Sequence, residues 1–209
     1  MITLFIDTST DTLTVSIIND DVILDEITLP SSEHSKYAMS AIESIFDKNN
    51  IKRNSVNKIM VVNGPGSFTG IRIGVTIAKI YAWACNINIV PISTLKAYAI
   101  SNMSYKYYIS SIDARRNYVY AAIYDSNYNN ILDESYINKD DLINKIIKLE
   151  DYLIISNTPI SEFNTVKPKL DIKRIYDYYK NDIGINCHAL KPVYLKEVEA
   201  VEKMGGYND

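Results

Sequence analysis

Two segments of this chain, one in each half, follow the same pattern without a gap. Residues 6–18 read Ile-Asp-Thr-Ser-Thr-Asp-Thr-Leu-Thr-Val-Ser-Ile-Ile, and residues 112–124 read Ile-Asp-Ala-Arg-Arg-Asn-Tyr-Val-Tyr-Ala-Ala-Ile-Tyr. Each begins with Ile-Asp at the end of an apolar stretch, turns through polar or small residues, and resumes with apolar residues at alternate positions, the period of a β-strand. The pattern predicts a duplicated β-hairpin and therefore two related lobes.

The elements that follow each hairpin support the duplication. In the first half, period and turn residues predict strands over 2–6, 13–18, 22–29, 58–62 and 87–92, and helices over 35–49 and 71–85. In the second half they predict strands over 131–137 and 152–155 and a helix over 140–148. The order βββαβ thus occurs twice. We expect an α/β fold of two lobes, 1–100 and 101–209, each a mixed sheet with flanking helices.

A glycine-rich turn connects a predicted strand to a predicted helix in the first lobe. Four of the seven glycines fall in this run, at Gly64, Gly66, Gly70 and Gly74. Backbone N–H groups and a helix N-terminus in such a turn can face an anion. The spacing matches neither a Walker A loop nor the GxGxxG or GxSxG motifs. A tight connection without a ligand explains the run equally well.

Composition limits the function classes that remain. Hydrophobic residues make up 47% and charged residues 22% of the 209 residues, and the net charge is −3, which does not indicate an autonomous nucleic-acid-binding surface. The two cysteines, Cys85 and Cys187, indicate neither a disulfide framework nor a zinc site. The sequence shows no cationic-then-apolar leader and no long apolar run, so we expect a cytoplasmic protein without a membrane segment.

The arrangement resembles a known fold and, more closely, a known family. Duplicated βββαβ lobes with an aspartate at the first hairpin are similar to the actin-like ATPase fold, which is related to RNase H. Segments shared in the same order with the TsaB family are residues 6–9, 64–74, 93–95, 113–120 and 192–196. The resemblance covers nearly the whole chain and is weakest over 152–188. It implies an accessory subunit in the synthesis of threonylcarbamoyladenosine on tRNA.

The resemblance also implies where a ligand cleft would lie. In actin-like proteins the hairpins of both lobes face the phosphates of a nucleotide, and a degenerate form of that cleft is expected here from Asp7, Thr8, Ser9, Gly64, Gly66, Ser67, Thr69, Gly70, Asp113 and Arg115. No metal site is predicted, because His34 and His188 are far apart and do not form the HxxxH pair of the related catalytic protein TsaD. We expect no catalytic residue and no required cofactor in this chain, with ATP and metal on the partner.

The two predicted helices of the first lobe carry more apolar surface than one sheet face needs. The helix over 71–85 is apolar around most of its circumference, which indicates burial on two sides. By resemblance, this surface would contact a TsaD-type subunit through Tyr37, Ala38, Ala41, Ile42, Ile45, Ile73, Ile77, Ile80 and Tyr81. Cover by the chain's own second lobe, or self-association as a dimer, are the alternatives.

Further partners and a second function class complete these expectations. A TsaE-type ATPase would be reached through the TsaD-type subunit, and tRNA only through the complex. The alternative function is an autonomous actin-like phosphotransferase or metallopeptidase. If the chain is an accessory subunit, Arg115 and Arg116 are either surface charges or anion contacts where the lobes meet.

Overall fold

The computed structural model describes residues 1–30, 34–102, 104–161 and 163–196, apart from the side chain of His34. It contains two five-stranded mixed sheets. The first has the strand order β3-β2-β1-β4-β5, with β1 (Ile2–Asp7), β2 (Thr12–Asn19), β3 (Val22–Pro30), β4 (Val56–Gly64) and β5 (Ile89–Ser93). The second has the order β10-β9-β6-β7-β8, with β6 (Tyr107–Asp113), β7 (Tyr118–Asp125), β8 (Asn130–Asn138), β9 (Tyr152–Ser156) and β10 (Thr165–Val166).

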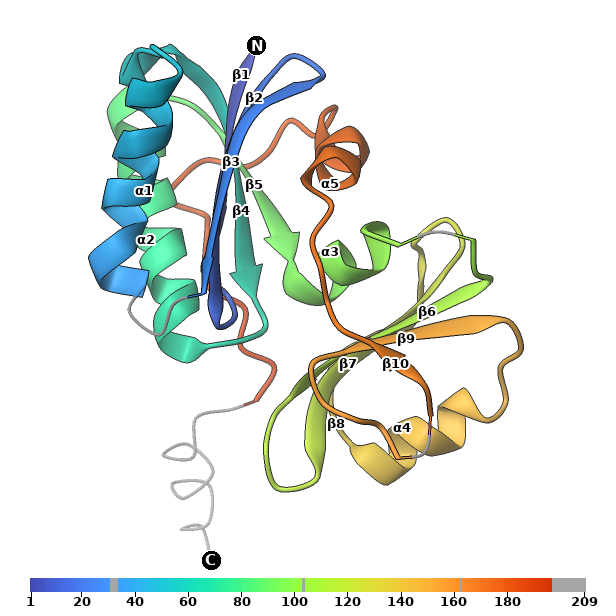
Figure 1. Cartoon of the computed structure of the whole chain (residues 1–209). Coiled ribbons are helices and arrows are strands. Elements are labelled where there is room, and N and C mark those ends of the chain that lie inside the picture. The colour runs from blue at the N-terminus through green and yellow to red at the C-terminus, as the bar shows by residue number, and fades with distance from the viewer. Residues whose placement is uncertain (31–33, 103, 162, 197–209) are drawn as a thin grey trace, which may run out of the picture.

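The two sheets are built alike, and the predicted fold class is confirmed. In each, an antiparallel hairpin (β1–β2 and β6–β7) is followed by a third antiparallel strand, and a parallel strand (β4 or β9) lies on the other side of the first. The register differs at the turn. Asp7 pairs with Thr14, whereas Asp113 pairs with Val119, so the second turn is one residue shorter. Figure 1 shows the two sheets in separate halves of the molecule with α3 (Thr94–Ile100) between them.

Helices α1 (His34–Lys48) and α2 (Phe68–Cys85) cover one face of the first sheet (Figure 1). Strand β2 sends alternate apolar side chains to this face, as the sequence period predicts. They pack in one core cluster against both helices, and its members include Leu13, Val15, Ile17, Ala38, Ile42, Ile45, Ile71, Val75 and Ala78. In the second lobe α4 (Lys139–Ile146) covers the equivalent face through Leu142 and Ile146.

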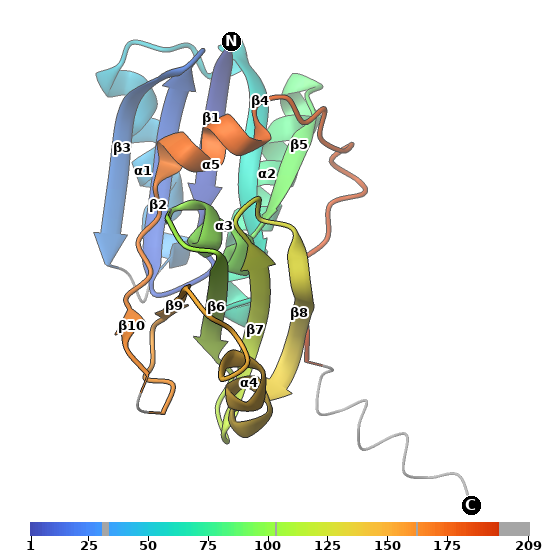
Figure 2. The same cartoon turned by 90° about the vertical axis from the view of Figure 1, so that its right-hand side faces the viewer.

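The opposite face of the first sheet is covered by elements that the sequence did not predict. Helix α5 (Ile172–Tyr179) lies across this face in Figure 2, and its buried Ile175 and Tyr176 pack with Phe5 and Met60. Helix α3 was missed because it is only seven residues long and six of them are buried, so its sequence shows no apolar stripe opposite a polar face. Helix α5 does carry an apolar stripe at helical spacing, which was available as a signal.

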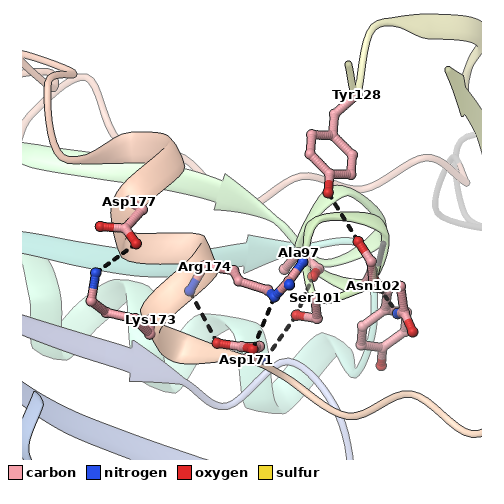
Figure 3. Close-up of polar contacts among 9 residues, drawn as sticks. Ala97, Ser101, Asn102, Tyr128, Asp171, Lys173, Arg174 and Asp177 are labelled. Atoms are coloured by element: carbon pink, nitrogen blue, oxygen red, sulfur yellow. Dashed lines mark hydrogen bonds and ion pairs between the residues drawn. The ribbon is translucent and has the colours of Figure 1, made fainter. Parts of the chain in front are cut away.

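Polar contacts fix α5 to the end of α3 (Figure 3). Asp171 is the N-cap of α5: its carboxylate accepts the N–H of Arg174 at 3.0 Å, and its own N–H donates to the Ser101 hydroxyl at 2.9 Å. Tyr128, from the turn after β7, donates its hydroxyl to the carbonyl oxygen of Asn102 at 2.9 Å. These bonds join the first sheet, the inter-lobe helix and the second sheet.

After α5 the chain stays on the first lobe. The N–H of Ile89 donates to the Ile185 carbonyl at 2.9 Å, and the N–H of Val193 donates to the Asn63 carbonyl at 2.8 Å. The expected division assigned all of 101–209 to the second lobe, but residues 172–193 pack on the first. Helix α5 packs with α3 on one face of its sheet, and Cys187 and Leu190 belong to the core cluster on the other face. Residues 197–209 lie outside the described residues.

The backbone of α2 approaches the β1–β2 turn directly. The Thr8 hydroxyl donates to the Gly70 carbonyl at 2.7 Å and accepts the N–H of Gly74 at 3.1 Å. A Cβ on Gly70 would lie too close to the Thr8 carbonyl oxygen. The Ser67 hydroxyl caps the helix by accepting the N–H of Gly70. Glycine is therefore needed here for protein packing, whatever else the turn does.

Replacing Gly70 tests this contact. Alanine favours a helix over glycine by up to about 1 kcal/mol, but here the methyl group must displace the β1–β2 turn. We expect Gly70→Ala to lower the free energy of unfolding by about 1–3 kcal/mol in urea titrations, the usual cost of overpacking. The exposed Thr76→Ala on the same helix should change it by less than about 0.5 kcal/mol. A Gly70→Ala protein as stable as the wild type would show that Thr8 moves aside freely.

Tyr98 of α3 gives a test of the inter-lobe packing. Burial, with the nearby carboxylates of Asp7 and Asp11, raises the pKa of Tyr98 above its ordinary value of 10. Above that pH the unfolded chain loses this proton and the folded chain keeps it, so stability falls as the pH rises. We expect Tyr98→Phe to make this decline shallower by about 1.4 kcal/mol per pH unit. The exposed Tyr105→Phe should keep the wild-type slope, and an unchanged slope for Tyr98→Phe would contradict the prediction.

Candidate functional site: the inter-lobe cavity and the α2 face

A cavity of about 990 Å³ lies between the lobes. The first lobe contributes its β1–β2 turn and the start of α2, and the second lobe contributes its β6–β7 turn and the residue after β9. The residues used below are Ser9, Asp11, Gly66, Ser67, Phe68, Asp113, Arg115, Arg116, Tyr120, Asn157 and Lys196. The duplicated hairpins that the sequence revealed thus meet at one cavity.

Half of the predicted cleft residues line this cavity. Those that do are Ser9, Gly66, Ser67, Asp113 and Arg115, and those that do not are Asp7, Thr8, Gly64, Thr69 and Gly70. The second group is largely occupied inside the protein. Asp7 is buried and accepts the N–H of Ser9 at 2.7 Å, and a Cβ on Gly64 would lie 2.6 Å from the Val193 carbonyl oxygen. At Gly64 and Gly70, the glycine allows a close backbone contact within the protein, as expected for a tight strand-to-helix connection.

The β6–β7 turn holds its residues in an unusual conformation. Arg115, Arg116 and Asn117 have φ angles of 65°, 52° and 63°, in the left-handed region that costs a non-glycine residue about 1–2 kcal/mol. Hydrogen bonds hold the turn: the N–H of Ala114 donates to the Tyr118 carbonyl at 3.0 Å, and the N–H of Lys139 donates to the Asn117 carbonyl at 2.9 Å. The turn places both arginines on the cavity wall.

Three tyrosines of the second sheet stand beside this turn. Tyr118 and Tyr136 stack with ring centroids 4.5 Å apart, and Tyr120 lies 5.9 Å from Tyr136. The ammonium of Lys196 is 5.5 Å from the Tyr136 ring. Burial raises the pKa of Tyr120, although Lys196 opposes this, so the phenol is neutral at physiological pH. Sequence reasoning missed Tyr120, Asn157 and Lys196 because these residues meet only when both sheets and the C-terminal segment are assembled.

The α1–α2 surface differs from the predicted interface. Ala38, Ala41, Ile42 and Ile45 are buried in the first lobe's own core and are closed to another chain. The prediction was wrong for these four residues because the apolar stripe of α1 faces β2 within the same lobe. Of the other predicted residues, Tyr37 is exposed and Ile73, Ile77 and Tyr81 are half-buried against the same core.

What remains open is a strip along α2, which we call the α2 face: Ile73, Ile77, Ile80 and Trp83. These residues follow one another at helical spacing, and the side chains of Ile80 and Trp83 are 61% and 69% exposed. At the N-terminal end of α2, the Arg72 guanidinium lies 3.9 Å from the ring centroid of Phe68, and its Nε donates to the Tyr194 hydroxyl at 2.9 Å. We expected α2 to be buried on two sides; within this chain only its inner side is buried, and the side with Ile80 and Trp83 is exposed.

The described part of the chain has neither a cluster of metal-ligating side chains nor a helix suited to span a membrane. Its His, Cys, Asp and Glu residues form no group of three or more that could hold a metal ion. None of its helices is both long and apolar enough to span a membrane.

Comparisons with known proteins agree with this architecture. A family profile described as "TsaD: tRNA N6-adenosine threonylcarbamoyltransferase" matches residues 26–179. YeaZ from Pseudomonas aeruginosa superposes with a TM-score of 0.76 at 19% identity, covering 93% of this chain and 99% of that one, and so shares the fold.

Curated relatives with similar sequences carry one shared name. The "tRNA threonylcarbamoyladenosine biosynthesis protein TsaB" of Bacillus subtilis is 40% identical over 126 residues, 59% of this chain and 55% of the relative. The protein of the same name in Escherichia coli is 31% identical over 131 residues, 61% of this chain and 57% of the relative. The matched region spans little more than half of each relative. Taken with the profile, these matches show that the chain belongs to the TsaD family and, within it, to the TsaB group.

Proposed function

We propose that this chain is a non-catalytic subunit that binds a TsaD-type catalytic protein and supports it in forming threonylcarbamoyladenosine on tRNA. The observation that carries the proposal is the α2 face, an exposed apolar strip on a helix that is otherwise packed in the core. The names of the relatives supply the process. They favour this function over an autonomous phosphotransferase or metallopeptidase.

The α2 face suits association with another helix. Burying a side chain the size of Ile80 or Trp83 contributes about 1.5–3 kcal/mol, and tryptophan is enriched among the residues that dominate binding energy. On the inner side of the helix, Gly74 and Ala78 are already packed against the sheet. A partner is therefore needed to cover the outer side. In its absence, a second copy of the chain covers the same face as a two-fold dimer.

The other parts of the proposal follow from this docking. A TsaE-type ATPase and tRNA are reached through the TsaD-type subunit, which holds ATP and the metal. This chain then needs no cofactor for its supporting role. The site of action is the cytoplasm.

Charged substitutions on the α2 face test the docking. We expect Ile80→Glu with Trp83→Glu to weaken binding to the TsaD-type protein at least 100-fold in calorimetry, because two carboxylates cannot be buried unpaired. The melting temperature should stay near that of the wild type, since both side chains are exposed. Ile42 is unsuitable for this test because it is 3% exposed and belongs to the core.

A matched control distinguishes loss of the α2 face from a general effect of added negative charge on binding. Ile183 is 81% exposed and lies outside α2, so Ile183→Glu should leave the affinity unchanged. Equal affinity of the double variant and the wild type would remove the α2 face as the docking surface.

Reconstitution tests the non-catalytic role. With purified proteins, tRNA, ATP and the threonylcarbamoyl donor system, we expect modified adenosine only when this chain and the TsaD-type protein are both present. Adding the double variant in place of the wild type should reduce the yield at least tenfold. Product formed by this chain alone, or by the partner alone at full yield, would contradict the proposal.

A further inference from the structure

The exposed side of α2 has a cation near its N-terminal end. Arg72, Thr76, Ile80 and Trp83 follow one another at helical spacing, which places them on one side of the helix, and all four are exposed. Arg72 therefore extends the α2 face toward the start of the helix. With a rise of about 1.5 Å per residue, it lies about 12 Å along the helix axis from Ile80.

Two aromatic rings hold the Arg72 side chain. Its guanidinium carbon lies 3.9 Å from the ring centroid of Phe68 and 5.9 Å from that of Tyr194. The two rings pack on each other with centroids 5.0 Å apart, and Nε of Arg72 donates to the Tyr194 hydroxyl at 2.9 Å. Both rings are themselves partly exposed, so the cluster lies at the surface. Arg72 is therefore both restrained and open to another molecule.

No carboxylate within the described part of the chain neutralises Arg72. Its polar and ring contacts there are those with Phe68 and Tyr194, which leaves the two terminal nitrogens of the guanidinium for another acceptor. The other charged residue of α2 is Lys79, whose ammonium donates to the Leu190 carbonyl at 3.1 Å. The helix thus carries two cations and no Asp or Glu. A second copy that meets this helix with its own α2 offers Arg72 no counter-charge.

A partner that covers the α2 face must therefore match a positive charge. Packing over Ile80 and Trp83 and along the helix also removes Arg72 from water. Burying a guanidinium without a counter-charge is strongly unfavourable, whereas a carboxylate can accept two parallel N–H bonds from its planar fork. The rings already restrict the side chain of Arg72, so little conformational freedom is lost when the pair forms.

We propose that Arg72 is the specificity determinant of the α2 face and pairs with a carboxylate of the TsaD-type partner. The pairing rests on the proposed function, since it adds one charged contact to the same interface. The carboxylate lies about 12 Å along α2 from the partner surface that covers Ile80. A second copy of the chain binds the apolar part of the face without this pair, so Arg72 favours the partner over self-association.

Calorimetry with the TsaD-type partner at low and high salt tests the pairing. We expect Arg72→Gln to weaken binding at least tenfold at low salt and to remove most of the salt dependence, because salt screens the wild-type pair. Arg72→Lys should keep the salt dependence and lose less affinity, since it keeps the charge without the planar fork. Self-association, measured by sedimentation, should be no weaker for Arg72→Gln than for the wild type.

Two further variants distinguish the charge of Arg72 from other effects. Tyr194→Phe removes the hydroxyl that accepts from Arg72 but keeps the ring and the guanidinium, so it should lose less than threefold in affinity and keep the salt dependence. Lys145→Gln removes one positive charge from the exposed surface of α4 in the second lobe, and it should bind the partner as the wild type does. Melting temperatures show that each variant remains folded.

The outcomes separate this pairing from the proposed function. The pairing alone is overturned if the Ile80→Glu, Trp83→Glu variant loses the partner but Arg72→Gln keeps the wild-type affinity and salt dependence. It is also overturned if Tyr194→Phe loses as much affinity as Arg72→Gln, since Arg72 would then act by holding the segment that carries Tyr194. Equal weakening of self-association and partner binding by Arg72→Gln would overturn its role in specificity. A wild-type chain that does not bind the partner would overturn both proposals.

Discussion

The contact between Thr8 and the glycine side of α2 determines most of what this molecule can present to others. Because the Thr8 hydroxyl bonds to the backbone of both Gly70 and Gly74, the helix lies on the β1–β2 turn with only the Thr8 side chain between them. The inner side of α2 is thereby fully used within the lobe. Its N-terminus is fixed at the inter-lobe cavity, and its outer side is left facing away from the sheet.

The duplicated lobe lacks this arrangement, and the difference creates the cavity's asymmetry. Strand β9 is followed by a loop rather than by a long helix, so nothing in the second lobe corresponds to α2 in the part that is described. The β6–β7 turn is one residue shorter than its counterpart, and it carries Arg115 and Arg116 where the first lobe has Ser9 and Thr10. One wall therefore supplies backbone N–H groups and hydroxyls, while the other supplies cations and tyrosines.

The pattern of apolar residues predicted the hairpins, every strand except β10, and three of the helices. Strand β3 alternates open and partly buried positions, whereas β1, β2 and β4 are buried on both faces and are apolar runs bounded by turn residues. The pattern failed for α3, of whose seven residues six are buried, and it misjudged what covers the apolar stripe of α1. A stripe such as Ala38 and Ile42 reports that a face is buried, but not whether the same chain or a partner covers it. The cavity was half predicted, through the aspartate hairpins. Lys196 and Asn157 come from segments whose neighbours are known only after folding.

Helix α2 joins the inter-lobe cavity to the α2 face. It begins at the cavity with Ser67 and Phe68 and carries Ile80 and Trp83 near its other end. A partner that bound the α2 face and shifted the helix would also shift its Ser67 end at the cavity. By linkage, a molecule that the cavity held more tightly after that shift would raise the affinity for the partner by the same factor.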